Sequence, residues 1–238
     1  MAESIVIVAA KRTPMGSFQS DFANLSASDL GAVAIKAAVE QAGLKPEQVE
    51  QVYFGNVLMA GQGQAPARQA TLKAGLPKSA AAVTVHKVCG SAMQTIMMAA
   101  DTIKAGSADI LVAGGMESMT NAPYLLKKAR GGYRIGHDKV YDHMMLDGLE
   151  DAYEEGRSMG TFGEECAEKY NFTREQQDAF AMASVQRAQD AIAAGSFKDE
   201  IVPVTVADRR GERGIDTDEA PGRIKIARIP PLRPAFRK

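Results

Sequence analysis

The chain has 238 residues, of which 45% are hydrophobic, and this is enough apolar material for the core of one large domain or two small ones. Its 28 basic and 29 acidic residues give a formal net charge of -1, so the surface as a whole would not attract a nucleic-acid backbone or an anionic membrane. No stretch approaches the roughly 20 apolar residues of a membrane span, and no basic leader precedes a long apolar run. We therefore expect a soluble, cytoplasmic protein that binds neither nucleic acid nor membrane.

The sequence contains two cysteines, Cys89 and Cys166, and three histidines. Two cysteines cannot make a disulfide framework, and no Cys-x-x-Cys pair is present. We therefore expect neither a structural zinc nor any other metal site.

The first half of the chain alternates between patterns typical of strands and of helices. A continuous apolar run of Ile and Val over residues 4–10 is typical of a strand that is covered on both faces in a parallel sheet. Further strands are predicted over residues 51–58, 82–88 and 109–113, and helices from residue 28 to Gly43 and over residues 66–74 and 90–105. This alternation predicts an α/β fold with a mostly parallel sheet flanked by helices.

The second half has a different character. Residues 123–160 are rich in charge and glycine and show no sustained period, which predicts a loop-built insertion. A helix is predicted over residues 174–194, because Thr173 and Gln176 have the spacing of a capping box and Gly195 follows. A strand over 200–206, a turn over 208–212 and an extended Pro-rich tail over 221–238 complete the chain. We therefore divide it into an α/β domain, residues 1–118, and a loop-rich domain, residues 119–238.

Cys89 lies where the strand over 82–88 changes into the helix over 90–105. A lone cysteine is usually a small buried hydrophobe. Here the small residues Gly90, Ser91 and Ala92 follow it, and they allow a ligand to approach the backbone. The free N–H groups of a helix N-terminus favour anions, both a thiolate and the oxyanion that forms when a thiolate attacks a thioester or ester carbonyl. We therefore select Cys89 as the candidate nucleophile.

The helix alone does not activate a thiol sufficiently. A helix terminus supplies about 0.3–2 kcal/mol, which leaves most of an ordinary thiol protonated at neutral pH, so a partner base is required. His86 is nearest in sequence, but a packing or hydrogen-bonding role behind the turn is the favoured interpretation, and His137 and His143 are expected to be solvated in the insertion. Cys166 is flanked by carboxylates, which disfavour a thiolate, and is interpreted as structural.

The segment around Cys89 resembles the nucleophile motif of the thiolases. The motif reads Val85-His86-Lys87-Val88-Cys89-Gly90-Ser91-Ala92-Met93. Further stretches that resemble the family are residues 12–16, 61–69, 113–119, 159–160, 176–181 and 232–236. Two positions depart from the usual pattern, because the family commonly has Asn, Ser or Thr where His86 stands and often Gly where Ala92 stands. The resemblance implies a layered thiolase-like fold with a loop-rich insertion.

The same resemblance implies an activity. Cys89 would take an acyl group from acyl-CoA, and a second acetyl-CoA would attack the thioester in a Claisen condensation, with thiolysis as the reverse. Acetyl-CoA and coenzyme A would be substrates, with no covalently bound cofactor. Positions that match the family's coenzyme A site are Leu149, Ser158, Met159, Ala235 and Phe236, with Arg223 near the nucleotide end. Met159 favours a short acyl chain. The resemblance also implies a homodimer or homotetramer, with residues 127–142 as the tetramer-forming loop.

Length is the largest departure from the family. Its members continue beyond residue 238 with a second sheet domain that supplies an Asn, a His and a further Cys to the reaction. We therefore expect these 238 residues alone to have little or no turnover and to self-associate through uncovered apolar surface. A non-catalytic acyl-CoA-binding or dimerisation fragment is the alternative. A ketoacyl-synthase relative is disfavoured by the motif and the insertion, and an unrelated nucleotide binder by the lack of a phosphate loop.

Overall fold

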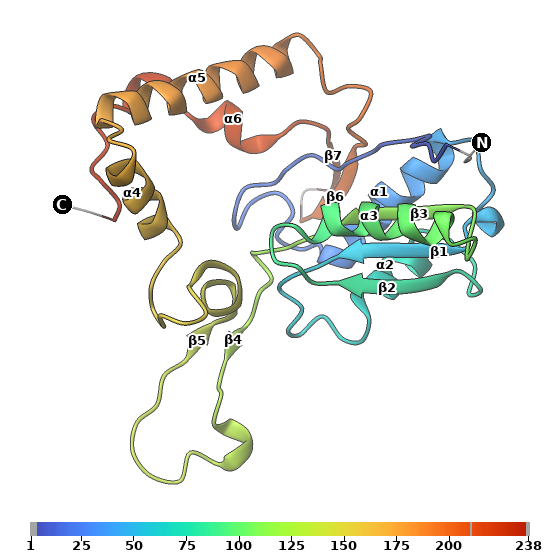
Figure 1. The fold of residues 1–238 in the computed structure, drawn as a ribbon, viewed down its shortest axis with the longest axis horizontal. Helices are drawn as coiled ribbons and strands as arrows, with labels where there is room; N and C mark the ends of the chain where they lie inside the picture. Colours follow the sequence, from blue (N-terminus) through green and yellow to red (C-terminus); the bar gives the residue numbers. More distant parts are fainter. Residues whose placement is uncertain (1–3, 210, 237–238) are drawn as a thin grey trace.

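The computed structural model describes residues 4–209 and 211–236. A sheet of three parallel strands, in the order β2-β1-β3, forms the main unit, and it consists of β1 (Gln51–Gly55), β2 (Ala81–Val85) and β3 (Leu111–Gly115). Helices α1 (Ala27–Gln41) and α2 (Pro66–Lys73) cover one face, and α3 (Ser91–Lys104) lies on the other (Figure 1). The predicted α/β architecture with a parallel sheet between helices is confirmed.

The register of the sheet brings three carboxyl ends to one edge. Gly55 of β1 pairs with Val85 of β2 on one side and with Gly115 of β3 on the other. The chain leaves β1 earlier than the apolar run over 51–58 suggests, because the amides of Val57 and Leu58 bond to the carboxylate of Glu117 rather than to a strand. Residues that follow the three strands therefore meet at this edge.

The main core lies between the sheet and helices α1 and α2. Helix α1 begins one residue before its predicted start, with a Ser26–Asp29 capping box. Its fully buried Ile35 packs in a cluster with residues from the sheet and from α2, namely Val39, Val52, Phe54, Ala67 and Ala70. A Cβ on Gly31 would lie 2.6 Å from Sδ of Met116, so this helix and the end of β3 approach closely.

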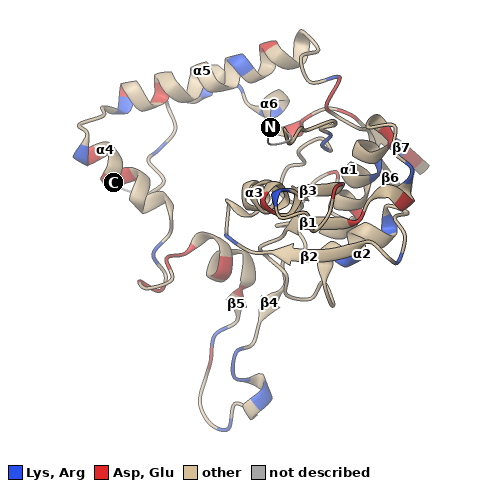
Figure 2. Cartoon of the chain, turned by 45° about the vertical axis from the view of Figure 1, so that its right-hand side comes forward, with Lys and Arg blue, Asp and Glu red and all other residues tan. Residues whose placement is uncertain are grey.

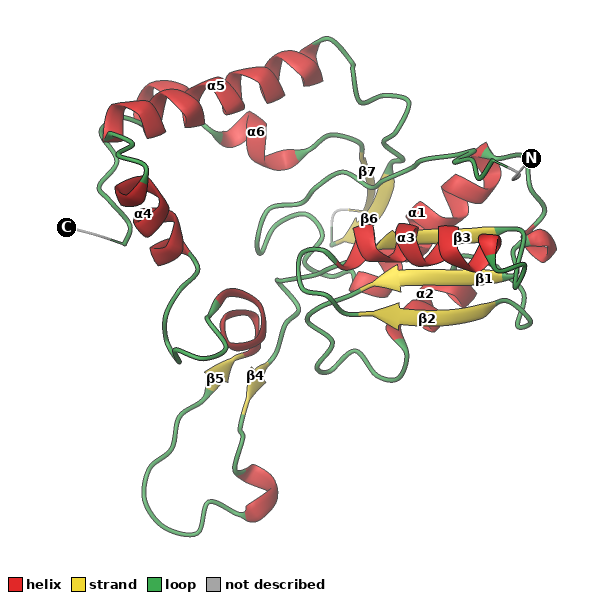
Figure 3. Ribbon diagram, in the orientation of Figure 1, coloured by secondary structure: helices red, strands yellow, loops and turns green. Residues whose placement is uncertain are grey.

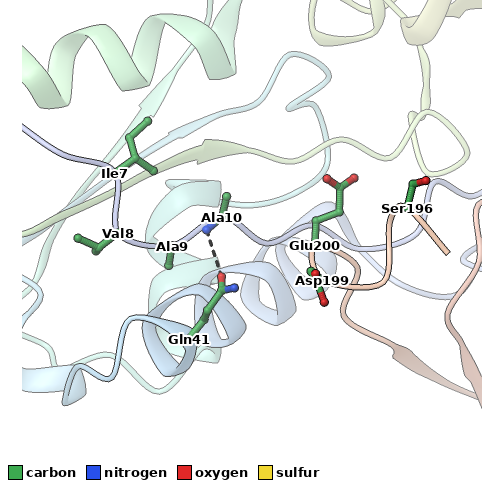
Figure 4. Close-up of a pocket in the computed structure, with 8 residues that line it drawn as sticks. All are labelled: Ile7, Val8, Ala9, Ala10, Gln41, Ser196, Asp199 and Glu200. Carbon is green, nitrogen blue, oxygen red and sulfur yellow. Dashed lines mark hydrogen bonds between the residues drawn. The ribbon is translucent and has the colours of Figure 1, made fainter. Parts of the chain in front are cut away.

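The prediction of a strand over residues 4–10 is wrong. These residues are extended and largely exposed, with 67% of Val8 accessible, and no strand forms there. The backbone N–H of Ala10 bonds to the side-chain oxygen of Gln41, and β3 pairs with β1 alone among the described residues (Figure 4). An apolar strand needs a neighbouring backbone, and local sequence does not reveal whether one is present. The segment instead borders a shallow cavity of about 360 Å³, lined by Ile7, Val8, Ala9, Ala10, Gln41, Ser196, Asp199 and Glu200.

The insertion contains more regular structure than predicted. A short hairpin of β4 (Tyr124–Leu125) and β5 (Tyr141–Asp142) carries a long loop with the 3₁₀ turn η2 (Ala129–Gly131), and the π-helical turn η3 (Met145–Leu149) follows. The loop projects away from the sheet (Figure 3). Helix α4 (Gly160–Lys169) was not predicted, whereas α5 (Arg174–Ala193) is confirmed with its Thr173 capping box.

The end of the chain returns to the first half. The hairpin of β6 (Val204–Asp208) and β7 (Gly211–Ile215) forms a second small core, in which Val204 and Val206 pack with Phe22. The predicted strand over 200–206 therefore begins later, and Arg210 of the turn lies outside the described residues. The tail is less extended than expected, because it contains α6 (Glu219–Arg223) and the 3₁₀ turn η4 (Ile226–Arg228). Another 3₁₀ turn, η1 (Pro46–Gln48), lies in the first half of the chain, before β1. The division into domains at residue 118 stays a prediction.

Charged residues of both signs lie on α4, α5 and the β6–β7 hairpin (Figure 2). Within the described ranges, no helix is both long and apolar enough to cross a membrane.

Arg12 fastens this returning segment to the N-terminal part. Its two terminal nitrogens bind the carboxylate of Asp218 at 2.7 and 2.8 Å, and its Nε binds Glu200 at 2.6 Å. Asp218 is 4% exposed and also accepts the backbone N–H of Met15. The hydrogen bond from Arg12 is the main cause that lowers the pKa of Asp218.

We predict that Asp218→Asn destabilises the protein by about 3 kcal/mol at neutral pH, because the guanidinium of Arg12 loses the buried one of its two carboxylate partners and keeps only Glu200. A carboxyl group whose pKa is lowered in the folded state stabilises the protein at pH values above the ordinary aspartate pKa of about 3.9. This stabilisation is lost as the pH falls through the pKa of the folded state. Urea unfolding at several acidic pH values should therefore show a shallower pH dependence for Asp218→Asn. Asp216→Asn, at an exposed position, is the control; equal slopes for the Asp218 variant and the wild type would contradict the prediction.

Candidate active site

Cys89 lies on the turn that joins β2 to α3, and its side chain is exposed. The turn is closed by hydrogen bonds from Gly90 N–H to Lys87 O and from Ser91 N–H to Val88 O, both 3.1 Å long. Val88, directly before the cysteine, has a positive φ of 46°. The left-handed residue reverses the chain, so that the thiol stands beside the first turn of the 14-residue helix α3.

Two side chains hold this turn. Ser91 is 4% exposed; its hydroxyl donates to Val88 O at 2.6 Å and accepts from Lys87 N–H at 2.8 Å. On the outer side, Nδ1 of His86 accepts the N–H of Val88 at 3.2 Å. Both polar groups of Val88 are therefore bonded within the turn.

Glycines at the strand ends allow helix α3 to approach the sheet. A Cβ on Gly55 would lie 2.7 Å from the Cβ of Ser91 and 2.8 Å from the backbone N of Ala92. A Cβ on Gly115 would lie 2.8 Å from the Cβ of Ala92. Larger side chains would push the beginning of α3, and with it Cys89, away from the sheet edge.

The same edge is braced by Glu117, which follows β3. Its carboxylate accepts hydrogen bonds from the side-chain amide of Asn56 at 2.8 Å and from the backbone N–H groups of Val57 and Leu58 at 2.8 and 3.1 Å. Asn56 is almost fully buried, and its backbone N–H bonds to Val85 O. Glu117 thereby ties the loop after β1 to the end of β3, beside the strand that leads into the Cys89 turn.

The residues around Cys89 provide hydrogen-bond donors for an anion but no base for the thiol. Its backbone N–H has no acceptor among the described residues, and its sulfur forms no hydrogen bond there. The free amide and the N-terminal end of α3 are able to stabilise an anion at the thiol. Within the described part of the chain, no group of three or more possible ligands could hold a metal ion.

The three histidines are all described and none forms a hydrogen bond with the sulfur. His86 uses Nδ1 for Val88, and His137 is exposed in the loop between β4 and β5. His143 is not solvated as expected. It is 5% exposed, its Nδ1 lies 2.6 Å from Asp147, and its Nε2 accepts the N–H of Ala60 at 3.2 Å.

Cys166 is exposed on α4, and its interpretation as a structural cysteine stays a prediction.

Most of the positions expected to bind coenzyme A lie together near the start of α4. The N–H of Met159 bonds to Leu149 O at 2.9 Å, and Ser158 forms a β-bridge with Glu150. The ring of Phe236, which follows Ala235, lies directly on Gly160, where a Cβ would be 2.0 Å from it. Met159 and Phe236 are each about half exposed and form an apolar surface. Among the described residues, no hydrogen bond joins this surface to Cys89.

Arg223 lies apart from that surface, on α6. Its guanidinium pairs with Glu219 and donates to the hydroxyl of Ser20 at 2.9 Å.

Comparison with known proteins identifies the family. The model of the thiolase N-terminal domain matches residues 5–238. The chain belongs to the thiolase family. It is 50% identical to the acetyl-CoA acetyltransferase of Pseudomonas aeruginosa over 238 residues, covering 99% of this chain and 60% of that protein. It is 48% identical to acetyl-CoA acetyltransferase 2 of Arabidopsis thaliana, covering 98% of this chain and 58% of that protein.

A solved thiolase shares the fold. The crystal structure of the Acat5 thiolase from Ascaris suum in complex with coenzyme A matches with a TM-score of 0.90 and 41% identity, covering 98% of this thiolase chain and 58% of the other. The resemblance inferred from the motifs is thereby confirmed. The chain spans about 60% of the length of the curated relatives it matches.

Sequence reasoning missed the supporting residues. Ser91 was noted only as small, whereas its buried hydroxyl closes the turn. Glu117 was recognised only within a family stretch, and Asn56 was not singled out. The clustering of Gly55 and Gly115 at strand ends was the one available signal, because glycine at such positions often marks a close backbone approach.

We predict that Gly55→Ala lowers stability by about 2 kcal/mol, since the new methyl group overlaps Ser91 and Ala92. The displaced turn should also slow alkylation of Cys89 by iodoacetamide, measured by peptide mass spectrometry with Cys166 of the same molecule as reference. Gly131→Ala, where nothing lies within 4 Å of the new Cβ, should change neither quantity. Unaltered stability and alkylation in Gly55→Ala would show that the close approach is unimportant.

Proposed function

We propose that Cys89 is the acyl-accepting nucleophile of a thiolase that interconverts acetyl-CoA and acetoacetyl-CoA. The observation that carries this proposal is the exposed thiol at the start of α3, on a fixed turn and beside an amide N–H without an acceptor. The names of two relatives support it, since the proteins of Pseudomonas aeruginosa and Arabidopsis thaliana are named acetyl-CoA acetyltransferases.

The reaction proceeds in two halves. The thiolate of Cys89 attacks the carbonyl carbon of acetyl-CoA, the carbon–sulfur bond to coenzyme A breaks, and the departing thiolate takes up a proton. A second acetyl-CoA then loses a proton from its methyl carbon, which attacks the enzyme thioester; a carbon–carbon bond forms and the thiolate of Cys89 is released. The oxyanion in each half carries negative charge beside the N-terminus of α3, where amide groups stabilise it. Thiolysis is the reverse.

The apolar surface of Met159 and Phe236 is proposed to hold coenzyme A, together with Leu149, Ser158 and Ala235. The solved Ascaris thiolase, which is in complex with coenzyme A, supports a ligand of this class. Arg223 is proposed to face the nucleotide end; it would have to exchange Glu219 or Ser20 for a phosphate. No covalent cofactor is required by this chemistry.

We expect one acetyl group per chain on Cys89 after incubation with acetoacetyl-CoA or acetyl-CoA, measured as intact mass and located by peptide mapping. Cys89→Ser should remain unmodified, and Cys166→Ser should behave as the wild type. Because no described residue is placed to deprotonate Cys89, steady-state turnover by these 238 residues alone should be close to that of Cys89→Ala. Acylation at Cys166 only, or none at all, would overturn the assignment; rapid turnover would overturn the predicted inactivity.

The alternative is a fragment that binds acyl-CoA or a sister chain without chemistry. It is favoured by the gathering of Leu149, Met159 and Phe236 at a site that, within the described part of the chain, shares no hydrogen bond with Cys89.

Calorimetry separates the alternatives. We predict that coenzyme A binds the wild type and that Phe236→Ala weakens binding by about tenfold, as expected for loss of an aromatic contact worth about 1–2 kcal/mol. Phe180→Ala is a matched control, because that ring is 78% exposed on α5. Binding without acylation would favour the non-catalytic function, and absence of binding would exclude it.

We also propose a homodimer or homotetramer in the cytoplasm. The apolar side chains Met93 and Met97, 70% and 53% exposed on the outer face of α3, support association, and sedimentation velocity measures it directly.

A further inference from the structure

The turn before Cys89 requires an unfavourable backbone conformation. Val88 has a φ of 46°, in the left-handed region that a β-branched residue rarely adopts. Such conformations persist only where surrounding contacts hold them. The contacts that hold Val88 therefore decide whether Cys89 keeps its place at the end of α3.

Val88 is held at both of its polar groups. Ser91 binds the carbonyl oxygen at 2.6 Å, and Nδ1 of His86 accepts the N–H at 3.2 Å. The N–H of Val88 has no other acceptor among the described residues. Ser91 is buried beneath the turn, whereas His86 is exposed above it.

We propose that His86 is a positioning residue for Cys89: its Nδ1 holds the N–H of Val88 and thereby the strained turn that presents the thiol at the N-terminus of α3. This inference rests on the proposed function only in taking Cys89 as the nucleophile. It differs from a catalytic role, because His86 acts through Val88.

The geometry also argues against His86 as the base for Cys89. In a neutral imidazole only one nitrogen carries a lone pair free to accept. That lone pair, on Nδ1, is used by Val88, so Nε2 carries the hydrogen and cannot take the thiol proton. The two roles exclude each other while the turn is formed.

To bind the N–H of Val88, the side chain of residue 86 needs a hydrogen-bond acceptor at a fixed distance from its Cβ. Nδ1 of histidine and Oδ1 of asparagine are both two bonds beyond Cβ, whereas the acceptor of glutamine is one bond further. Short side chains with an acceptor commonly bind the backbone N–H two residues ahead. Asparagine should therefore replace His86 and glutamine should not, although both are neutral amides.

The experiment compares His86→Asn, His86→Gln and His86→Ala in the full chain. Hydrogen exchange of the Val88 amide, followed by NMR, reports the hydrogen bond, and alkylation of Cys89 by iodoacetamide relative to Cys166 reports the position of the thiol. We expect Ala and Gln to speed exchange of this amide by about fivefold, the contribution of one net hydrogen bond, and to slow alkylation of Cys89 several-fold. Asn should remain close to the wild type in both.

A second background tests the strain. Glycine adopts a positive φ without steric cost, so the turn in Val88→Gly should no longer depend on His86. His86→Ala should then alter Cys89 alkylation less in Val88→Gly than in the wild type. An equal effect in both backgrounds would overturn the proposal, as would Ala matching the wild type, Asn matching Ala, or Gln matching Asn.

Failure of this proposal and failure of the proposed function are separable. Neither amide exchange nor alkylation involves coenzyme A. A wild-type chain that is not acylated by acyl-CoA contradicts the proposed function, while the comparison of the Asn and Gln variants still decides the role of His86, even where the Ala variant does not fold.

Discussion

The left-handed turn at Val88 is the constraint on which the site depends. It changes the direction of the chain between β2 and α3 in few residues, and so places Cys89 beside the amides at the helix N-terminus. If the chain between β2 and α3 did not change direction at Val88, the thiol would lie farther from these amide donors. The helix must also begin close to the sheet, which is possible because Gly55 and Gly115 leave room for the residues after the cysteine. The strained backbone of Val88 and the two glycines, Gly55 and Gly115, therefore all help to position the sulfur of Cys89.

The edge of the sheet is held by bonds between segments that are distant in sequence. Glu117 binds amides after β1, and the loop that continues from there donates through Ala60 to His143 of the insertion. His143 is fixed in turn by Asp147 in η3, the π-helical turn that ends at Leu149. These hydrogen bonds, together with the chain between Leu58 and Ala60, thus join the sheet edge beside Cys89 to the part of the insertion proposed to hold coenzyme A. Such a series fixes relative placement without any direct contact between the two sites.

Local sequence predicted what local interactions determine. The helix after Thr173 and the strand-to-helix change at Cys89 depend on capping, periodicity and small residues that lie within a few positions of each other. The strand over residues 4–10 could not be judged in this way, because strand formation depends on a partner backbone elsewhere. The same holds for Arg12 and Asp218, which form a bidentate pair 206 positions apart, and for the buried position of His143. The resemblance to thiolases supplied the candidate coenzyme A residues, which no periodicity would have selected.

The energy that a helix terminus supplies is small compared with the barrier reduction of an enzyme. A helix terminus contributes about 0.3–2 kcal/mol to an anion, which corresponds to at most about thirtyfold in rate, whereas enzymes commonly lower barriers by 8 kcal/mol or more. The turn at Cys89 therefore fixes the position of the proposed nucleophile and of the amides beside it, but a helix terminus supplies only a small part of an enzymatic acceleration. His86 uses its lone pair for the backbone N–H of Val88 and His143 is hydrogen-bonded to Ala60, so neither histidine is placed as a base for Cys89. The structure thus fixes the proposed nucleophile on a turn, while no described residue is placed to deprotonate it.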